Sequence, residues 1–368
     1  MEKGRSSTLS TPLFFFLFFT LFLSYSSLVA SQNHHNITAV FSFGDSTLDP
    51  GNNDRLATVM RSDHPPYGRD FARGVATGRF SNGKLVTDMI VTNLGIKDSV
   101  PAYRDPTITN HDLLTGVSFA SAGSGLDDLT ANVGNVIHMS TQLTDFQQCL
   151  NRIQSTVGNA TSTEIIQKAI FSVGAATNDM LFNYYDLPTR KAQYSLPGYH
   201  NFLLRNLENF VTSLYKMGAR KISITGLPPI GCLPIQSTVG SITPGPNMFQ
   251  HKCVEEQNSD SVGYNANLQG LITRLEASLP GAKIAYADIY SPLMDMIVNP
   301  KKYGFEQTLR GCCGTGYIEM AGLCNSMSIP ICEDSSKFIF FDAIHPTEAA
   351  YQNLANSIQK SVLPYLVN

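Results

Sequence analysis

The chain has 368 residues, which is long for a single domain, but no linker rich in Pro, Gly and Ser, no block of charge and no internal repeat divides it. Its 26 basic and 29 acidic side chains give a formal net charge of −3 at pH 7, and the basic residues form no run. This charge pattern argues against nucleic acid as a partner.

The first 31 residues have the pattern of a secretory signal peptide. Two basic residues near the start precede the apolar run 13–23, and small residues follow up to Ala30-Ser31. Cleavage is expected near this pair, with an uncleaved anchor as the alternative. The run is too short to span a bilayer comfortably, and no later stretch is long or apolar enough. We therefore expect a secreted mature chain, residues 32–368, that forms one domain without a transmembrane segment.

Beyond this segment, extended and helical patterns alternate along the chain. Short β-branched or apolar runs predict five strands, at residues 38–43, 117–121, 168–174, 221–225 and 283–287. Apolar residues at helical spacing predict helices within 82–94, 140–154, 202–214 and 262–275, and Pro346 is expected in the first turn of a last helix. Such alternation predicts an α/β fold of three layers, α/β/α, around a mostly parallel five-stranded sheet.

All seven cysteines lie in the part of the chain that would be secreted, where disulfides persist. Cys232 and Cys253 bracket a loop rich in Pro and Gly, which they are expected to close. Four more crowd into a short segment and are expected to staple a second loop: Cys312, Cys313, Cys324 and Cys332. A zinc site is the alternative, but no histidine stands at ligand spacing beside them. Cys149 lies on the apolar face of a predicted helix and is expected to be buried and free.

Two tripeptides match the acceptor pattern for N-glycosylation, Asn36-Ile-Thr38 and Asn159-Ala-Thr161. Such matches are common by chance. Export would make both available, and the surroundings of Asn159 have the composition of a loop.

Polar residues follow three of the predicted strands where parallel strands end at one edge of the sheet. Ser46 follows the first strand, Gly123 the second and Asn178 the third. In open α/β sheets this edge is where ligands bind. Near the end of the chain, Asp342 and His345 stand three residues apart, so both side chains can emerge on one side of a turn. Each feature also has a structural interpretation: a helix N-cap for Ser46, a turn residue for Asn178, a surface turn for the Asp-His pair.

Together these residues have the composition of an acyl-transfer site. A serine hydroxyl needs a base to accept its proton, which is a role for His345, and that histidine needs a carboxylate to fix its tautomer, which is a role for Asp342. The backbone N–H groups of Ser46 and Gly123 and the side-chain amide of Asn178 can converge as an oxyanion hole. Neither a metal nor an organic cofactor is required.

The chain resembles the GDSL esterase/lipases, also called SGNH hydrolases, and within them the secreted plant-type branch. The resemblance spans nearly the whole mature chain and rests on motifs in a fixed order: Phe43-Gly-Asp-Ser46-Thr-Leu-Asp-Pro-Gly-Asn-Asn53, Pro65-Pro-Tyr-Gly68, Ala76-Thr-Gly-Arg-Phe-Ser-Asn-Gly83, Gly116-Val-Ser-Phe-Ala-Ser-Ala-Gly123, Leu227-Pro-Pro-Ile-Gly-Cys-Leu-Pro234, Gly311-Cys-Cys-Gly314 and Phe341-Asp-Ala-Ile-His-Pro-Thr-Glu348. It implies a flavodoxin-like fold, Ser46 as nucleophile, Gly123 and Asn178 as oxyanion donors, and His345 as base with Asp342 as its partner.

One position departs from the family pattern. The third block usually reads Gly-x-Asn-Asp, whereas Ala176 precedes Thr177-Asn178-Asp179 here. If the backbone has a positive φ at this position, the alanine costs on the order of 1 kcal/mol. Because Asn178 is retained, the departure bears on efficiency rather than on mechanism.

The resemblance implies a secreted hydrolase of lipid, acyl or acetyl esters, located in the cell wall or apoplast. Two alternatives stay open at this stage: a binding or scaffold protein that keeps the fold without turnover, and an acyltransferase that uses the same residues with an alcohol in place of water. The sequence determines neither the ester nor the oligomeric state.

Overall fold

The computed structural model describes Met1, Gly4 and residues 37–187, 189–328 and 330–367. Apart from Met1 and Gly4, the predicted signal segment lies outside the described residues, as does the acceptor Asn36. The fold below is that of the compact unit Thr38–Asn368. Within the described ranges, no helix combines the length and the apolarity that a bilayer span requires.

A four-stranded parallel sheet lies at the centre of this unit, in the order β1 (Val40–Gly44), β2 (Ile170–Gly174), β3 (Lys221–Thr225) and β4 (Lys283–Ala287). The remaining predicted strand, 117–121, runs parallel to the free edge of β1. Ser42 N donates to Val117 O over 3.1 Å, and Phe119 N donates to Ser42 O over 2.8 Å. The segment is too irregular to form a full ladder, but it lies where the sequence predicted an additional strand.

The two faces of this sheet differ sharply in side-chain size. Odd positions of β1 and β2 carry Phe41, Phe43 and Phe171, which pack against Phe146 and Phe210 at ring-centroid distances of 5.5 to 5.6 Å. On the other face, the two rows nearest the carboxyl edge are small: one row across the sheet consists of Ser42, Ser172, Ser223 and Ala285, and the next of Gly44, Gly174, Thr225 and Ala287. The core is therefore dense on one side of the sheet and more open on the other.

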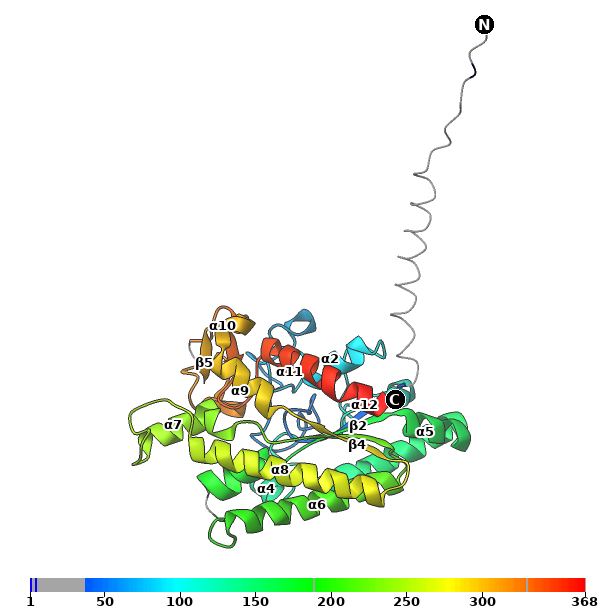
Figure 1. Ribbon diagram of the computed structural model, residues 1–368, viewed down its shortest axis with the longest axis horizontal. Coiled ribbons are helices and arrows are strands. Elements are labelled where there is room, and N and C mark those ends of the chain that lie inside the picture. Colours follow the sequence, from blue (N-terminus) through cyan, green and yellow to red (C-terminus); the bar gives the residue numbers. More distant parts are fainter. Residues whose placement is uncertain (2–3, 5–36, 188, 329, 368) are drawn as a thin grey trace. The chain divides into compact units, whose positions relative to one another are not determined.

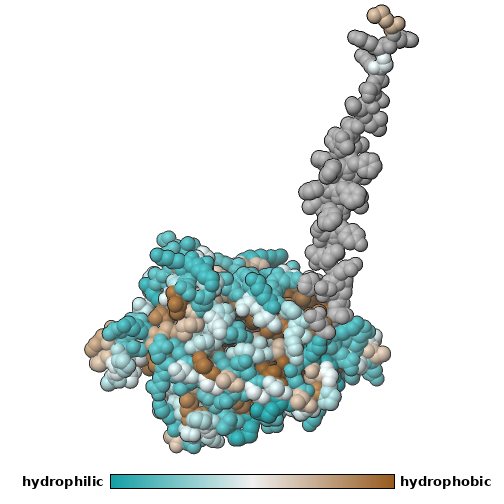
Figure 2. Space-filling model, in the orientation of Figure 1, coloured by the Kyte–Doolittle hydropathy of each residue, from teal (hydrophilic) through white to brown (hydrophobic). Residues whose placement is uncertain are grey.

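Helices cover both faces, which gives the predicted three layers (Figure 1). One layer contains α4 (Asp128–Gly134), α5 (Met139–Lys168), α6 (Leu196–Lys216) and α8 (Glu255–Ser278). The other contains α2 (Val86–Asn93), α9 (Tyr290–Val298), α11 (Glu348–Ser361) and α12 (Leu363–Val367). The remaining helical elements are α3 (Asn110–Leu114), the π-helix η2 (Asp179–Asp186), α7 (Pro234–Ile242), α10 (Pro300–Tyr303) and the 3-10 turns η1 (Ala72–Gly74), η3 (Ile230–Cys232), η4 (Ala321–Leu323) and η5 (Ser335–Lys337). On the face shown in Figure 2, hydrophilic side chains predominate and hydrophobic ones show through in small groups.

Two local predictions need correction. Pro346 precedes the last helix instead of occupying its first turn, because Thr347 is the N-cap of α11 and accepts a hydrogen bond from Ala350 N. Asn159 is exposed as expected, but it lies inside α5 and not in a loop. Gly158 immediately before it has a φ of 79°, so the helix is interrupted where the composition suggested a loop.

The cysteines form the expected staples. Cys232 bonds to Cys253, and the crowded segment forms two further bridges, Cys312–Cys332 and Cys313–Cys324. All four clustered thiols are therefore disulfide-bonded, which decides against the zinc alternative. Beside them, β5 (Gln307–Gly311) and β6 (Phe338–Phe340) form a small parallel pair that the sequence did not predict. Cys149 is free and buried, and burial raises the pKa of its thiol to about 12.

Candidate active site

Ser46 lies in a tight turn directly after β1, at the carboxyl edge of the sheet. The turn requires glycine at its start. Gly44 has a φ of +134°, and a Cβ there would lie 1.8 Å from the carbonyl oxygen of Gly174. The next residue, Asp45, closes the turn by accepting hydrogen bonds from the backbone N–H and hydroxyl of Thr47, over 3.0 and 2.8 Å. No helix begins in this turn, so the N-cap interpretation of Ser46 does not apply.

A continuous chain of hydrogen bonds joins Ser46, His345 and Asp342. The Oγ of Ser46 lies 2.7 Å from Nε2 of His345, and the Nδ1 of that ring lies 2.7 Å from Oδ2 of Asp342. All three side chains are nearly enclosed, with exposed fractions of 6%, 5% and 0%. Asp342 Oδ1 also accepts from the backbone N–H groups of Ile344 and His345, over 2.8 and 2.7 Å. The Asp-His spacing of three residues thus forms one turn that orients both side chains.

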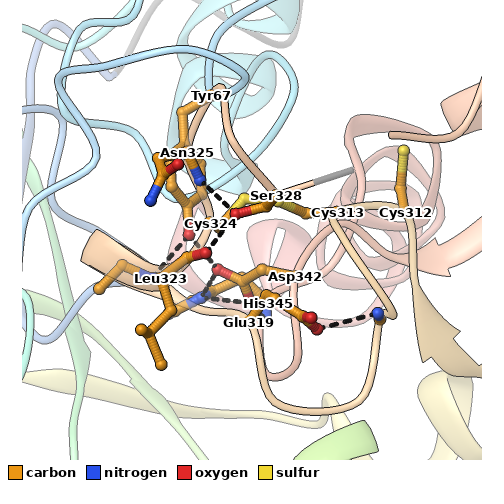
Figure 3. The surroundings of a disulfide bond; sticks show 12 residues. Tyr67, Cys312, Cys313, Glu319, Leu323, Cys324, Asn325, Ser328, Asp342 and His345 are labelled. Atoms are coloured by element: carbon orange, nitrogen blue, oxygen red, sulfur yellow. Dashed lines mark hydrogen bonds and ion pairs between the residues drawn. A yellow bond between two sulfur atoms is a disulfide. The ribbon is translucent and has the colours of Figure 1, made fainter. Parts of the chain in front are cut away.

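Tyr67 contributes a further contact that sequence reasoning missed. Its hydroxyl donates to Asp342 Oδ2 over 2.6 Å and accepts from the backbone N–H of Ala321 over 2.9 Å. Figure 3 shows this tyrosine and the Asp342–His345 pair beside the Cys313–Cys324 bridge. Burial, with the neighbouring carboxylate, raises the pKa of Tyr67 well above its usual value, so the phenol keeps its proton. The only sequence signal was its place in the Pro65-Pro-Tyr-Gly68 motif.

The disulfide-stapled segment is also bonded to the Asp342 turn through the backbone. Cys312 N donates to Phe340 O over 3.1 Å, and Cys313 N donates to Phe341 O over 2.8 Å. In the opposite direction, Ala343 N donates to Glu319 O over 2.8 Å. The two bridges in this segment therefore support the turn that carries the carboxylate and the imidazole.

Gly123 and Asn178 line one small pocket together with Ser46 and His345. Gly123 has a φ of +81°, and a Cβ there would approach Met60 Cγ to 2.9 Å. Neither its backbone N–H nor that of Ser46 donates a hydrogen bond to another described residue. Asn178 uses one of its two amide hydrogens to bond Ser124 O over 2.9 Å, which orients the side chain. These groups can donate to a negative charge that develops beside Ser46.

The remaining polar residues of the first motif tie the turn after β1 to the segment that carries Gly123. Asn52 Nδ2 donates to the carbonyl oxygens of Ser118 and Ala120, over 2.9 and 2.8 Å. Asn53 Nδ2 donates to Ala122 O over 2.9 Å. Asp49 accepts from the N–H of Ala122 over 2.9 Å, and burial raises the pKa of this carboxyl to about 6. The motif thus fixes the separation of Ser46 and Gly123.

Asp179 fixes the position of Asn178 in a similar way. It is fully buried and accepts hydrogen bonds from the backbone N–H of Leu126, over 2.8 Å, the N–H of Asp127, over 3.0 Å, and the hydroxyl of Thr130. Burial raises the pKa of this carboxyl to about 7 despite these donors. The third block is thereby anchored to the segment that follows Gly123.

Ala176 has the positive φ that makes an alanine energetically costly at this position. Its φ is 95°, in the region that favours glycine, and its side chain is completely buried. The strain lies two residues before Asn178. Because the amide of Asn178 still bonds Ser124, the alanine leaves the orientation of this donor intact.

The rest of the pocket beside Ser46 is lined mainly by apolar side chains. They come from separate segments: Met60, Phe80, Ala122, Phe182, Met320, Ala321 and Ile344. The ring of Phe80 lies 4.7 Å from that of His345, centroid to centroid, and limits the movement of the imidazole. Within the described residues, no group of three or more His, Cys, Asp or Glu side chains is arranged to hold a metal ion.

The chain belongs to the family of GDSL-like lipases/acylhydrolases, whose family model matches residues 40–358. A protein from Arabidopsis thaliana named as a GDSL esterase/lipase is 48% identical over 357 residues, which cover 96% of this chain and 98% of the relative. Two more Arabidopsis proteins with the same type of name are each 47% identical, over 92% of this chain and 95% or 94% of their own length. The similarity therefore extends across the whole fold.

The contact between Tyr67 and Asp342 leads to a first prediction. In Tyr67→Phe the carboxylate loses one donor and the N–H of Ala321 loses its acceptor, at a cost of about 1–3 kcal/mol, so we expect Ser46 to react with a fluorophosphonate about 10- to 100-fold more slowly. Labelling kinetics measure this effect. Tyr185→Phe is the matched control. Tyr185 also donates to a carboxylate, that of Asp260, over 2.7 Å, but neither residue belongs to the triad. A labelling rate equal to that of wild type would show that Tyr67 does not position the site.

The strain at Ala176 leads to a second prediction. Ala176→Gly removes a left-handed alanine, which offsets the lost methyl contacts and the greater freedom of glycine when unfolded, so we expect a melting temperature within about 1 °C of wild type. The control is Ala169→Gly, where the alanine is equally buried but has a φ of −68°. That variant should melt at least about 2 °C lower, since only the losses remain. If calorimetry shows the same loss of melting temperature in the two glycine variants, Ala176 is not strained.

Proposed function

We propose that this protein is a secreted serine esterase that hydrolyses carboxylic esters, with Ser46 as nucleophile, His345 as base and Asp342 as the partner of the base. The observation that carries this proposal is the unbroken pair of 2.7 Å contacts from Ser46 Oγ through the imidazole to the carboxylate. The names of the Arabidopsis relatives, GDSL esterase/lipase, support the same reaction class.

The first half of the reaction acylates Ser46. Its Oγ attacks the ester carbonyl carbon while Nε2 of His345 takes the hydroxyl proton. The resulting imidazolium is stabilised by Asp342, which accepts from Nδ1. Collapse of the tetrahedral intermediate breaks the bond to the alcohol oxygen, and His345 returns its proton to this leaving group. The products are a free alcohol and an acyl ester of Ser46.

The second half repeats these steps with water in place of Ser46. His345 takes a proton from the water, whose oxygen attacks the acyl carbonyl carbon. Collapse of the second tetrahedral intermediate releases the carboxylic acid and returns the proton to Ser46. An alcohol in place of water would give acyl transfer, which uses the same groups.

We assign three hydrogen-bond donors to the oxyanion of each intermediate. These are the backbone N–H groups of Ser46 and Gly123 and the free amide hydrogen of Asn178, which line the pocket together. Removal of one such donor typically lowers kcat by about 10²–10³-fold. The anchoring of all three segments by Asp49, Asn53 and Asp179 supports a preorganised hole.

Secretion is part of the proposal. The amino-terminal segment 1–31 has the pattern of a removable signal peptide, and six of the seven cysteines form disulfides, which persist outside the cytosol. The acceptor Asn159 is exposed, as glycosylation requires. We place the mature chain, residues 32–368, in the cell wall or apoplast.

We expect Ser46→Ala and His345→Ala each to lower kcat for p-nitrophenyl acetate by at least about 10⁴-fold, because both residues act in one chain of proton transfer. Ester hydrolysis measured beside circular dichroism separates loss of chemistry from loss of fold. Ser237→Ala is a suitable control, since it removes another buried hydroxyl, one without a hydrogen-bond partner. Near wild-type hydrolysis by either active-site variant, or no hydrolysis by wild type, would refute the proposal.

A further inference from the structure

The motif Ala76-Thr-Gly-Arg-Phe-Ser-Asn-Gly83 contributes Phe80 to the pocket beside Ser46, but the residues directly after Phe80 do not line this pocket. They are nevertheless almost fully buried, with exposed fractions of 0% for Ser81 and 4% for Asn82. They precede α2, which packs against α11 (Figure 1). Their polar atoms contact the chain on either side of the turn that carries Asp342 and His345.

The side chain of Asn82 bonds to both ends of the segment that contains this turn. Its Oδ1 accepts from the backbone N–H of Glu348, the first residue of α11, over 2.9 Å. Its Nδ2 donates to Oγ of Ser335, shortly before β6, over 3.2 Å, and to Oδ2 of Asp70 over 2.8 Å. A backbone N–H can only donate and a carboxylate can only accept, so these partners define which way the amide points. One amide thus joins the two ends of residues 335–348.

The two residues before Asn82 contact the same turn at its histidine. The ring of Phe80 lies 4.7 Å from the imidazole of His345, centroid to centroid. The Oγ of Ser81 donates to the carbonyl oxygen of Pro346, directly after that histidine, over 3.2 Å. Three consecutive side chains therefore contact the imidazole, the peptide that follows it and the start of the next helix.

A role as a helix cap explains only part of these contacts. Thr347 is already the N-cap of α11, and the bond from Glu348 N to Asn82 satisfies one more N–H of the first turn. The bond to Ser335 has no part in capping, because β6 and the Asp342 turn separate that serine from the helix. The amide therefore holds the whole segment and not only the end of the helix.

We propose that Asn82 is a positioning residue for the esterase reaction, which holds both ends of residues 335–348 so that His345 stays in contact with Ser46; this inference rests on the function proposed above. Only an amide of this length can accept at one end and donate at the other. Without it the two ends can move apart, and the imidazole lies between them. A misplacement of about 1 Å can lower the rate about 100-fold.

The test replaces the amide by an apolar side chain of similar size. We expect Asn82→Leu to lower kcat for p-nitrophenyl acetate at least about 10-fold and to change KM less than about 2-fold, because the groups that contact the ester are unchanged. Asn265→Leu is the matched control. Asn265 is also buried, and its amide accepts from Leu227 N over 2.7 Å and donates to Leu227 O over 2.9 Å, but it does not line the pocket. Its kcat should stay within about 2-fold of wild type.

Proton NMR gives a readout that depends on neither turnover nor global stability. The proton between Nδ1 of His345 and Asp342 lies in a charge-assisted hydrogen bond and should give a low-field signal, which is assigned by its loss in His345→Ala. We expect this signal to broaden beyond detection in Asn82→Leu, where the imidazole is less well held, and to stay sharp in Asn265→Leu.

A kcat of Asn82→Leu close to that of wild type, or an equal loss of kcat in the two leucine variants, would overturn the positioning role and leave the esterase proposal intact. If wild type is inert, the esterase proposal fails, and persistence of the low-field signal in Asn82→Leu would then overturn the positioning role separately. If Asn82→Leu does not fold, Asn82→Asp keeps the acceptor for Glu348 N but removes the donor to Ser335. It should still lower kcat at least about 3-fold relative to Asn265→Asp.

Discussion

The buried carboxylate of Asp342 is the group on which the rest of the site depends. It has no exposed surface, and burial of a charge without compensation is costly. Its compensation comes from Tyr67, from two backbone N–H groups of its own turn and from the imidazole of His345. Three of these donors belong to the turn of Asp342 itself, whereas Tyr67 lies 275 residues away in the sequence, so the orientation of the imidazole depends on both the local turn and long-range packing.

The sheet supplies the second constraint, through the difference between its faces. Phenylalanines at odd positions fix β1 and β2 against α5 and α6, which gives the Ser46 turn a rigid base. The small residues on the other face let the backbone of Gly44 approach Gly174, and they also leave a cavity behind the turn. The same alternation therefore positions the proposed nucleophile and leaves the cavity behind its turn.

Much of this arrangement was predictable from local patterns. Ser46, Gly123 and Asn178 follow predicted strands, and parallel strands bring such residues to one edge; the spacing of Asp342 and His345 predicts a shared turn. Tyr67 was not predictable as a partner of Asp342, because 275 residues separate them and a lone tyrosine in a loop carries no periodic signal. The pairing within the cysteine cluster depends on how the loop that carries it folds. The rows of small residues depend on the register of the strands, which is known only when the strands are aligned. The conformation of Ala176 likewise depends on its tertiary surroundings.

We propose that the fold activates one serine, Ser46, among the many in this chain. The most direct measurement is peptide mass mapping of the protein after reaction with a fluorophosphonate, in wild type and in His345→Ala. We expect a single adduct, on the peptide that contains Ser46, and its loss when the imidazole is removed. An adduct on another serine, or one on Ser46 that forms equally well without His345, would contradict it.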